Sequence, residues 1–136
     1  MRQHSASRCS RSENMRRISS KNTRPELIVR RLLRDLGYPG YRLHRKDLPG
    51  KPDITYIGRR KAILIHGCFW HKHDCKRGQY WPKSNQDYWI PKLERNIQKD
   101  KENTQELTKM GWKVLVIWEC ETINRKLLSI KLALFL

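Results

Sequence analysis

Four side chains of the kind that bind zinc restrict how this chain can fold. Cys68, His73 and Cys75 lie within eight residues, and Cys120 follows an apolar run much further along the chain. Structural zinc sites close a tetrahedron with thiolate and imidazole ligands of this kind. A zinc ion held by all four would fasten the segment after residue 67 to the strand that ends near residue 120. Free cysteine is often simply buried, which is the alternative, but the short spacing of the first three ligands favours zinc.

The charge of the chain indicates the class of its partner. The 136 residues include 30 Lys and Arg against 13 Asp and Glu, a formal net charge of +17. A surplus this large repels itself in a folded domain and suits a protein whose partner is a polyanion, so nucleic acid is the first candidate. A basic protein at a membrane surface is the alternative, but apolar runs such as 114–118 cannot span a bilayer and no signal peptide is evident. We therefore expect no membrane partner and a reducing cytoplasmic location, where cysteines bind metal rather than form disulfides.

The first residues differ in composition from the rest of the chain. Residues 1–24 hold seven Lys and Arg against one acid, together with many Ser and Asn. We predict that residues 1–22 form a basic, flexible arm, in which Arg16 and Arg17 contact DNA phosphates, and that residues 23–136 form one domain. A solvated tail without a partner is the alternative. The remaining cysteine, Cys9, lies in this arm and is assigned no role.

Helix and strand signals alternate along the predicted domain. Thr23 and Glu26 have the spacing of a capping box, and apolar residues then recur at helical spacing up to Gly37, among them Leu27. The predicted elements are a helix over 23–36, strands over 41–44, 51–57 and 62–65, an irregular segment over 67–83, a long helix closing at 111, a strand over 112–118 and a helix over 123–134. This order predicts an α/β fold, with a mixed sheet flanked by helices.

Three local features sharpen this prediction. The residues Gly58-Arg59-Arg60 should form the tight turn of a hairpin between the strands at 51–57 and 62–65. Pro91 should lie in the first turn of the long helix or end a shorter preceding turn, because proline lacks the N–H that a helix interior needs. Trp112 and Trp118, on the last strand, are expected to pack in the core.

An acid and two histidines are candidates for phosphodiester hydrolysis. Asp53 begins one strand of the hairpin, the partner strand ends in Ile65 and His66, and His71 follows in the loop. The hairpin can bring the Asp53 carboxylate, the backbone carbonyl of Ile65 and both imidazoles together. A carboxylate and a carbonyl are hard ligands that suit Mg²⁺, and a nearby histidine can take a proton from an attacking water. An ordinary surface turn is the alternative for Asp53, because Pro-Asp pairs are common.

Aromatic and cationic side chains are interleaved in the segment that follows. Phe69 and Trp70 lie beside Lys72, and Trp89 comes just after the irregular segment. Aromatic rings can stack on bases or wedge between base pairs while cations hold the phosphates. We predict that all four side chains contact DNA, with packing in the core as the alternative for the three aromatic ones.

Several motifs together resemble one family. The run IHGCFWHKHDC at 65–75 is similar to the signature of the very-short-patch repair (Vsr) DNA mismatch endonucleases. Shorter matches lie in the same order at 12–15 (SENM), 23–26 (TRPE), 48–53 (LPGKPD) and 118–120 (WEC), so that the resemblance spans nearly the whole chain. It implies a restriction-endonuclease-like fold and an enzyme that nicks double-stranded DNA beside the T of a T:G mismatch. Such mismatches arise when 5-methylcytosine deaminates.

The resemblance also implies cofactors, partners and residue roles. Asp53 and the Ile65 carbonyl would hold catalytic magnesium, and His71 would be the catalytic histidine, assisted by His66 and Glu26. The enzyme would be a monomeric, nucleoid-associated bacterial protein with a functional link to a cytosine methyltransferase. The implied structural zinc ligands are Cys68, His73, Cys75 and Cys120, and the implied intercalating side chains are Phe69, Trp70 and Trp89.

The chain departs from the wider nuclease superfamily at the strand that follows Asp53. Ordinary members carry a second acid and a lysine there, whereas residues 62–65 are AILI; the repair family shares this departure and uses histidine instead. Ile65 stands where some members have Thr, which removes any side-chain role but leaves the carbonyl. Two other functions stay open, a zinc-containing nucleic-acid-binding module without catalysis and a restriction-like nuclease that cuts both strands. Asp53 with His71 favours an enzyme, because a pure binder needs no acid opposite a histidine.

Overall fold

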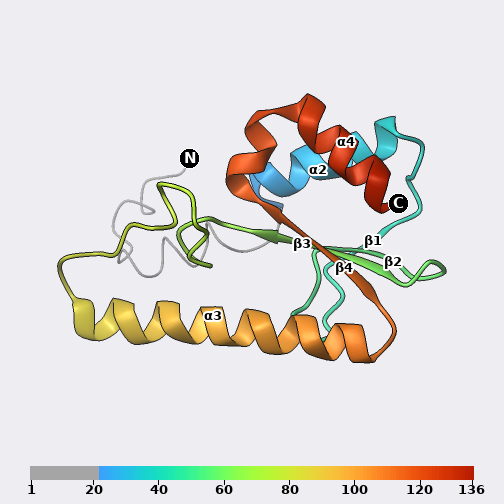
Figure 1. Ribbon diagram of the computed structural model, residues 1–136. Helices are drawn as coiled ribbons and strands as arrows, with labels where there is room; N and C mark the ends of the chain where they lie inside the picture. The colour runs from blue at the N-terminus through green and yellow to red at the C-terminus, as the bar shows by residue number, and fades with distance from the viewer. Residues whose placement is uncertain (1–21) are drawn as a thin grey trace, which may run out of the picture.

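The computed structural model describes residues 22–136, which form an α/β arrangement (Figure 1). The predicted order of helices and strands is confirmed. The elements are α2 (Arg24–Asp35), β1 (Arg42–Leu43), β2 (Ile54–Tyr56), β3 (Lys61–His66), α3 (Gln86–Lys109), β4 (Lys113–Trp118), the 3-10 helix η2 (Glu119–Ile123) and α4 (Arg125–Phe135). No helix within this described part is long and apolar enough to cross a membrane.

The four strands form one mixed sheet in the order β1-β2-β3-β4. β2 pairs antiparallel with β1 and β3, which confirms the predicted hairpin across residues 57–60. β4 pairs parallel with β3, and the long α3 provides the crossover that parallel neighbours require (Figure 1). As a result β3 and β4 end at the same edge of the sheet, where His66 lies opposite Trp118.

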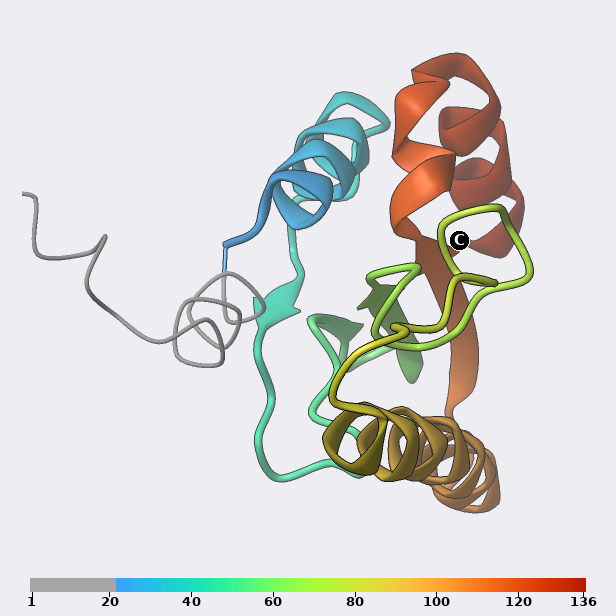
Figure 2. The same cartoon turned by 90° about the vertical axis from the view of Figure 1, so that its left-hand side faces the viewer.

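The core lies on both faces of the sheet, because alternate side chains of β3 point to opposite sides. Ile63 belongs to a buried cluster with residues of α2 and α4, whereas Ala62 and Leu64 pack with residues of α3. Figure 2 shows the resulting layers, with α2 and α4 on one side of the sheet and α3 on the other. Burial of each large aliphatic side chain contributes roughly 1.5–3 kcal/mol. His66 continues the alternation of Ala62 and Leu64, so it lies on the side of the sheet that α3 covers.

The start of α2 differs in detail from the prediction. The Thr23 side chain caps the helix and accepts a hydrogen bond from the Glu26 N–H at 3.4 Å. The Glu26 carboxylate accepts the N–H of Asn22 at 3.3 Å rather than that of Thr23, so the reciprocal half of the predicted capping box is shifted by one residue. Glu26 is buried, whereas Leu27, which was expected on the apolar face, is 47% exposed. The inward face of α2 is therefore rotated, and it carries a carboxylate toward the sheet.

Two elements in the second half of the chain also differ from the prediction. α3 begins at Gln86, so Pro91 lies in its second turn rather than its first. The helix continues through Pro91 although the proline cannot donate to the carbonyl of Asp87. The 3-10 helix η2 was not predicted, and it separates β4 from α4, which begins only at Arg125.

Candidate active site and metal centre

Asp53 and the end of β3 meet at one edge of the sheet. Asp53 directly precedes β2, and the antiparallel register of β2 and β3 places it beside the last residues of β3. Its Oδ2 atom accepts a hydrogen bond from the backbone N–H of Ile65 at 2.8 Å. Asp53, Ile65, His66 and His71 all line one cavity of about 1020 Å³. The hairpin and the loop after it thus bring Asp53, Ile65 and both imidazoles to one cavity, as the sequence analysis predicted.

The environment of Asp53 opposes its ionisation. Burial raises the pKa of this carboxyl to about 6, the hydrogen bond from the Ile65 N–H acts against that rise, and the nearby Glu26 carboxylate adds to it. His44 favours the ionised form. Ligand atoms of Glu26, His44 and Asp53 lie within 4.8 Å of one another, so these three side chains form a cluster that could hold a cation. A cation bound here would favour the ionised form of Asp53, because it would offset both the burial and the nearby carboxylate.

Glu26 sits beside Asp53 but has its own partners. Its Oε2 atom lies 2.8 Å from His44 Nε2 and 3.3 Å from Arg30 Nη1. Glu26 is 1% exposed, and a polar group this deeply buried is stable only when it has hydrogen-bonding or charged partners. His44 was not among the predicted site residues, and its contact with Glu26 spans 18 positions of the sequence.

His66 and His71 form a stacked pair in the cavity. Their rings are parallel within 5°, with centroids 3.9 Å apart. Burial lowers the pKa of His66 to about 4, and the adjacent His71 adds to this effect while Asp100 opposes it. His66 is therefore neutral at pH 7.

Asp100 of α3 lies close to both histidines of the pair. Its Oδ2 atom lies 2.6 Å from His71 Nδ1, and its Oδ1 atom lies 4.0 Å from His66 Nε2. With Nδ1–H donated to the carboxylate, Nε2 of His71 is left as an acceptor that can take a proton. Asp100 was not among the predicted site residues. It lies at helical spacing from Leu93, Ile97 and Leu107, and an acid on this mostly apolar face is the signal that could have identified it.

The four predicted zinc ligands converge beside the end of β4. The Sγ atoms of Cys68, Cys75 and Cys120 and one ring nitrogen of His73 lie within 4.8 Å of one another, and the three thiols are free. The Cys120 N–H donates to Cys68 Sγ at 3.4 Å, and Cys120 Sγ lies 3.5 Å from His73 Nδ1. Three thiols and one imidazole are the donor set of a closed structural zinc site. The cluster can therefore hold a metal ion.

The backbone around Cys75 supports this arrangement. A hydrogen bond from the Gly78 N–H lowers the pKa of the Cys75 thiol to about 7, whereas burial raises that of Cys68 to about 12. A Cβ atom at Gly78 would collide with the backbone of His73, so only glycine fits this close approach. Cys75 is thus partly prepared as a thiolate ligand.

Trp118 lies between the metal cluster and the histidine pair rather than in the core. Its ring stacks on His73 with centroids 4.2 Å apart, and its edge meets His66 at 5.2 Å. The prediction that Trp118 packs in the core is wrong, because Trp118 belongs to neither buried hydrophobic cluster and its ring contacts histidines at the end of β4 instead. Trp112, at the start of this strand, is buried in the core as predicted.

The predicted DNA-contacting aromatics form one wall of the cavity. Phe69, Trp70 and Trp89 all line it, and their ring centroids lie 5.4 to 5.7 Å apart. Trp89 is only 9% exposed, so most of its surface is covered by its neighbours. The Lys72 ammonium lies over Phe69 at 5.5 Å and over Trp81 at 4.2 Å, and it donates to the Tyr80 carbonyl. Arg24, Lys76 and Arg77 line the cavity together with the aromatic wall, so cationic and aromatic side chains share it.

Three residues that the sequence analysis singled out lie outside the described residues. They are Cys9, Arg16 and Arg17.

Comparison with known proteins agrees with this arrangement. Residues 4–77 match the family described as DNA mismatch endonuclease Vsr. The Type II nicking enzyme V.XorIIP of Xanthomonas oryzae is 53% identical over 107 residues, which is 79% of this chain and 77% of the relative. V.NmeAIP, a Type II nicking enzyme of Neisseria meningitidis, is 45% identical over 115 residues, covering 85% of this chain and 81% of the relative.

A further relative carries the family's own description. The DNA mismatch endonuclease Vsr of Escherichia coli is 34% identical over 122 residues, which is 90% of this chain and 77% of the relative. The family match over residues 4–77 includes Asp53, His66 and His71, and three members of the cysteine–histidine cluster, Cys68, His73 and Cys75. The chain belongs to the Vsr family of DNA mismatch endonucleases.

Proposed function

We propose that this Vsr-family nuclease nicks one strand of double-stranded DNA beside the T of a T:G mismatch, by magnesium-dependent hydrolysis of the phosphodiester, and so initiates very-short-patch repair. The observation that carries the proposal is the single cavity that Asp53, His66 and His71 share with an aromatic wall. The names of the relatives, nicking enzymes and a mismatch endonuclease, support the same reaction class. An enzyme of this class is a hydrolase.

Magnesium fits the oxygen donors at the edge of the sheet. The Asp53 carboxylate and the Ile65 carbonyl would hold the ion, because Mg²⁺ takes oxygen ligands and leaves room for phosphate and water. The raised pKa of Asp53 supports this assignment, since a buried carboxylate beside Glu26 gains from a cation. When bound, magnesium would supply stabilisation of the negative charge that develops on the phosphate.

The histidine pair is assigned the movement of protons. His71 would act as general base toward water through Nε2, and Asp100 would orient the imidazole from the other side. His66 stays neutral and would support the phosphate or the hydrolytic water, because a neutral imidazole can both donate and accept. Glu26 would assist from beside Asp53, where His44 and Arg30 hold its carboxylate in place.

Zinc is assigned to the cluster of Cys68, His73, Cys75 and Cys120, where it would be structural. The residues fit because they supply soft donors in the number that a closed tetrahedral site uses. The segment from 67 to 83 has little regular structure, and a metal ion would hold it against β4 in place of a core. The zinc site would thereby fix His71 and the aromatic wall relative to the sheet.

The aromatic wall is assigned selectivity for mispaired DNA. Phe69, Trp70 and Trp89 would wedge beside the mismatch, because unstacking costs least where pairing is already defective. Lys72 of the same loop, and Arg16 and Arg17 of the proposed basic arm at residues 1–22, would contact phosphates.

At the level of the whole chain, we propose a restriction-endonuclease-like domain over residues 23–136. We also propose that it acts as a monomer in the bacterial cytoplasm, where it associates with the nucleoid and is functionally linked to a cytosine methyltransferase. A monomer suits a reaction on one strand.

The test is a nicking assay on T:G and fully paired duplexes, each with Mg²⁺ and with a chelator. We expect one nick, on the T strand of the mismatched duplex, and only when Mg²⁺ is present. Equal nicking of paired DNA would remove the proposed specificity. Cleavage of both strands would instead indicate a restriction-like nuclease.

A further inference from the structure

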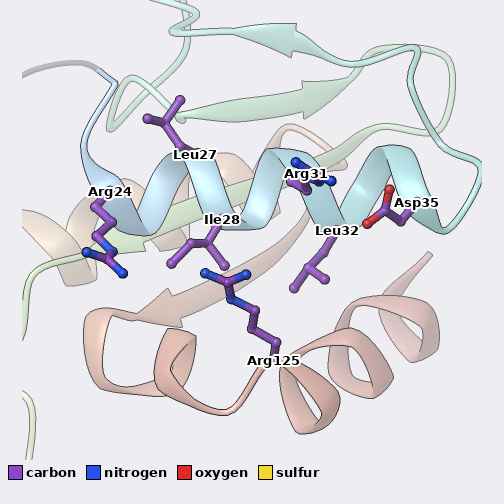
Figure 3. Close-up of a pocket in the computed structure, with 7 residues that line it drawn as sticks. All are labelled: Arg24, Leu27, Ile28, Arg31, Leu32, Asp35 and Arg125. Atoms are coloured by element: carbon purple, nitrogen blue, oxygen red, sulfur yellow. The ribbon is translucent and has the colours of Figure 1, made fainter.

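A second basic groove lies between α2 and α4, away from the catalytic residues. This cavity of about 550 Å³ has Ile28 and Leu32 in its floor, and three arginines and one aspartate around it. Figure 3 shows the Arg125 side chain rising from the start of α4 toward Ile28, with Arg24 beside it. The seven residues that line the groove are Arg24, Leu27, Ile28, Arg31, Leu32, Asp35 and Arg125.

In the part of the chain that the structure describes, the arginines that line this groove have no partners of their own. Within residues 22–136, none of Arg24, Arg31 and Arg125 makes a side-chain hydrogen bond or an ion pair. Two other arginines of α2 do have partners: Arg30 pairs with Glu26 at 3.3 Å, and Arg34 donates to the Tyr41 hydroxyl at 3.1 Å. The unpaired guanidinium groups of α2 therefore lie on the side that faces the groove. Guanidinium groups in such a position suit phosphate, which they can bind with two parallel hydrogen bonds.

The groove and the catalytic cavity share lining residues. Arg24 lines both, and it also lines a third cavity that lies between them beside the metal cluster. Lys76 and Arg77 line the middle and catalytic cavities, and Arg125 lines the middle cavity and the groove. Cationic side chains thus follow one another from the catalytic site over the metal-binding loop to α4.

We propose that the α2–α4 groove binds the phosphate backbone of the DNA duplex that extends beyond the nicked site. This inference rests on the proposed function, because it takes the catalytic cavity as the place of the scissile phosphate. A duplex held there must continue past the cavity, and the track from Arg77 through Arg24 to Arg125 offers charges for its phosphates. The apolar floor suits the carbon faces of the sugars, which alternate with phosphates along a strand.

An acidic peptide is the other occupant that such charges could bind. The cationic lining shared with the catalytic cavity favours DNA, because a separate peptide site would have no need of a row of cations leading to that cavity. Asp35 also lines the groove, one helical turn from Arg31, and would repel either ligand at that end.

The test compares two double variants on duplexes of two lengths. Arg31→Ala/Arg125→Ala removes two groove charges, and Arg34→Ala/Lys126→Ala removes two charges from the same helices outside the groove. A long T:G duplex carries about two helical turns on each side of the mismatch, and a short one carries about half a turn. Dissociation constants are measured against salt concentration, and single-turnover nicking is measured at saturating DNA.

We expect the groove variant to bind the long duplex about tenfold more weakly and to reduce the slope of log Kd against log salt by about two. Its affinity for the short duplex and its nicking rate at saturation should equal those of the wild type, and the control variant should keep most of the wild-type slope. Equal losses in both variants, or the same loss on both duplexes, would overturn the proposal.

Two further outcomes distinguish a failure of the groove assignment from a failure of the proposed function. Unchanged DNA affinity together with weakened binding of a polyglutamate peptide would show a peptide site and overturn the DNA assignment. If the wild type fails to nick T:G duplexes but the groove variant still loses affinity for the long duplex, the groove assignment stands and the proposed function falls.

Discussion

At the scale of single residues, the pairing of His71 with Asp100 determines which nitrogen can take a proton. The 2.6 Å contact engages Nδ1, so Nε2 is the free position. His66 contributes differently, because burial and the neighbouring ring keep it neutral down to a pH of about 4. The two stacked imidazoles therefore have distinct chemistry although they are identical side chains.

The role of Asp100 can be tested by Asp100→Asn. The amide keeps the shape of the side chain but loses the charge that favours the correct tautomer and the imidazolium of His71. We expect the single-turnover nicking rate to fall by about 10–10²-fold, less than the roughly 10²–10⁴-fold expected for His71→Ala. DNA affinity and Tm should change little.

A double variant shows whether Asp100 affects the nicking rate only by orienting His71 or also independently of it. In the His71→Ala background, Asp100→Asn should have almost no further effect on the rate, because residues that act as a unit are not additive. A full additional loss would show that Asp100 acts on something other than His71.

The predictable part of the site is the part that one hairpin and its following loop supply. Asp53, His66 and His71 follow from strand pairing and short spacing. Asp100 and His44 do not, because they reach the site from elements whose positions depend on tertiary packing. Glu26 was assigned through the family resemblance, and its burial between the sheet and His44 could not be derived from helical spacing.

At the scale of elements, the proposed zinc ion would fix the position of the irregular segment from 67 to 83. This segment carries His71 and most of the aromatic wall, while Trp89 comes from α3. Trp118 stacks on His73 and contacts His66, so the end of β4 links the position of the cysteine–histidine cluster to that of the histidine pair.

Cys120→Ser should release zinc and destabilise the chain, because the energy of metal binding is also folding energy. We expect the bound zinc to fall from about one per chain to near zero and Tm to fall by about 10 °C or more. Cys9→Ser is the matched control and should keep both values. A folded wild-type sample with well under one zinc per chain would contradict the assignment.

Phe69→Ala tests the aromatic wall. Removing the ring should lower the preference for T:G over paired duplex about tenfold, while affinity for paired DNA falls much less, because the wedge gains most where pairing is defective. Binding to both duplexes is measured by titration. Equal losses on the two would mean that Phe69 only packs against Trp70 and Trp89.

The sequence predicted the type and order of the elements well, because their periodic patterns are long. It failed where local signals are weak or tertiary contacts dominate. Pro91 suggested a helix start, yet α3 begins at Gln86 and continues past the proline, although the ring removes one hydrogen bond and crowds the carbonyl of Asp87. Trp118 belongs to an apolar run, but its ring stacks on His73 and contacts His66 instead of joining a buried hydrophobic cluster.

At the scale of the whole molecule, the net charge of +17 would attract DNA toward the cavity and the proposed groove. Such a charge makes binding to DNA strong and sensitive to salt. Within the described residues the cations include a track that begins at the cavity lined by Asp53 and His71, and residues 1–24 add seven Lys and Arg against one acid.

Deleting residues 1–20 should weaken DNA binding and flatten the slope of log Kd against log salt, because fewer counterions are released. Titration of a T:G duplex at several salt concentrations measures both. The nicking rate at saturating DNA should stay close to that of the full chain. An unchanged slope would mean that these residues do not contact DNA.

The proposed role of Asp53 is tested by Asp53→Ala, through single-turnover nicking of a T:G duplex at saturating enzyme and Mg²⁺. We expect nicking to be abolished while zinc content, Tm and DNA affinity are retained, because Asp53 is proposed to hold magnesium and not to hold the fold together. The control Asp47→Ala removes an exposed carboxylate of the same loop region, paired with Arg45, and should nick at the wild-type rate. Substantial nicking by Asp53→Ala would contradict the proposed site.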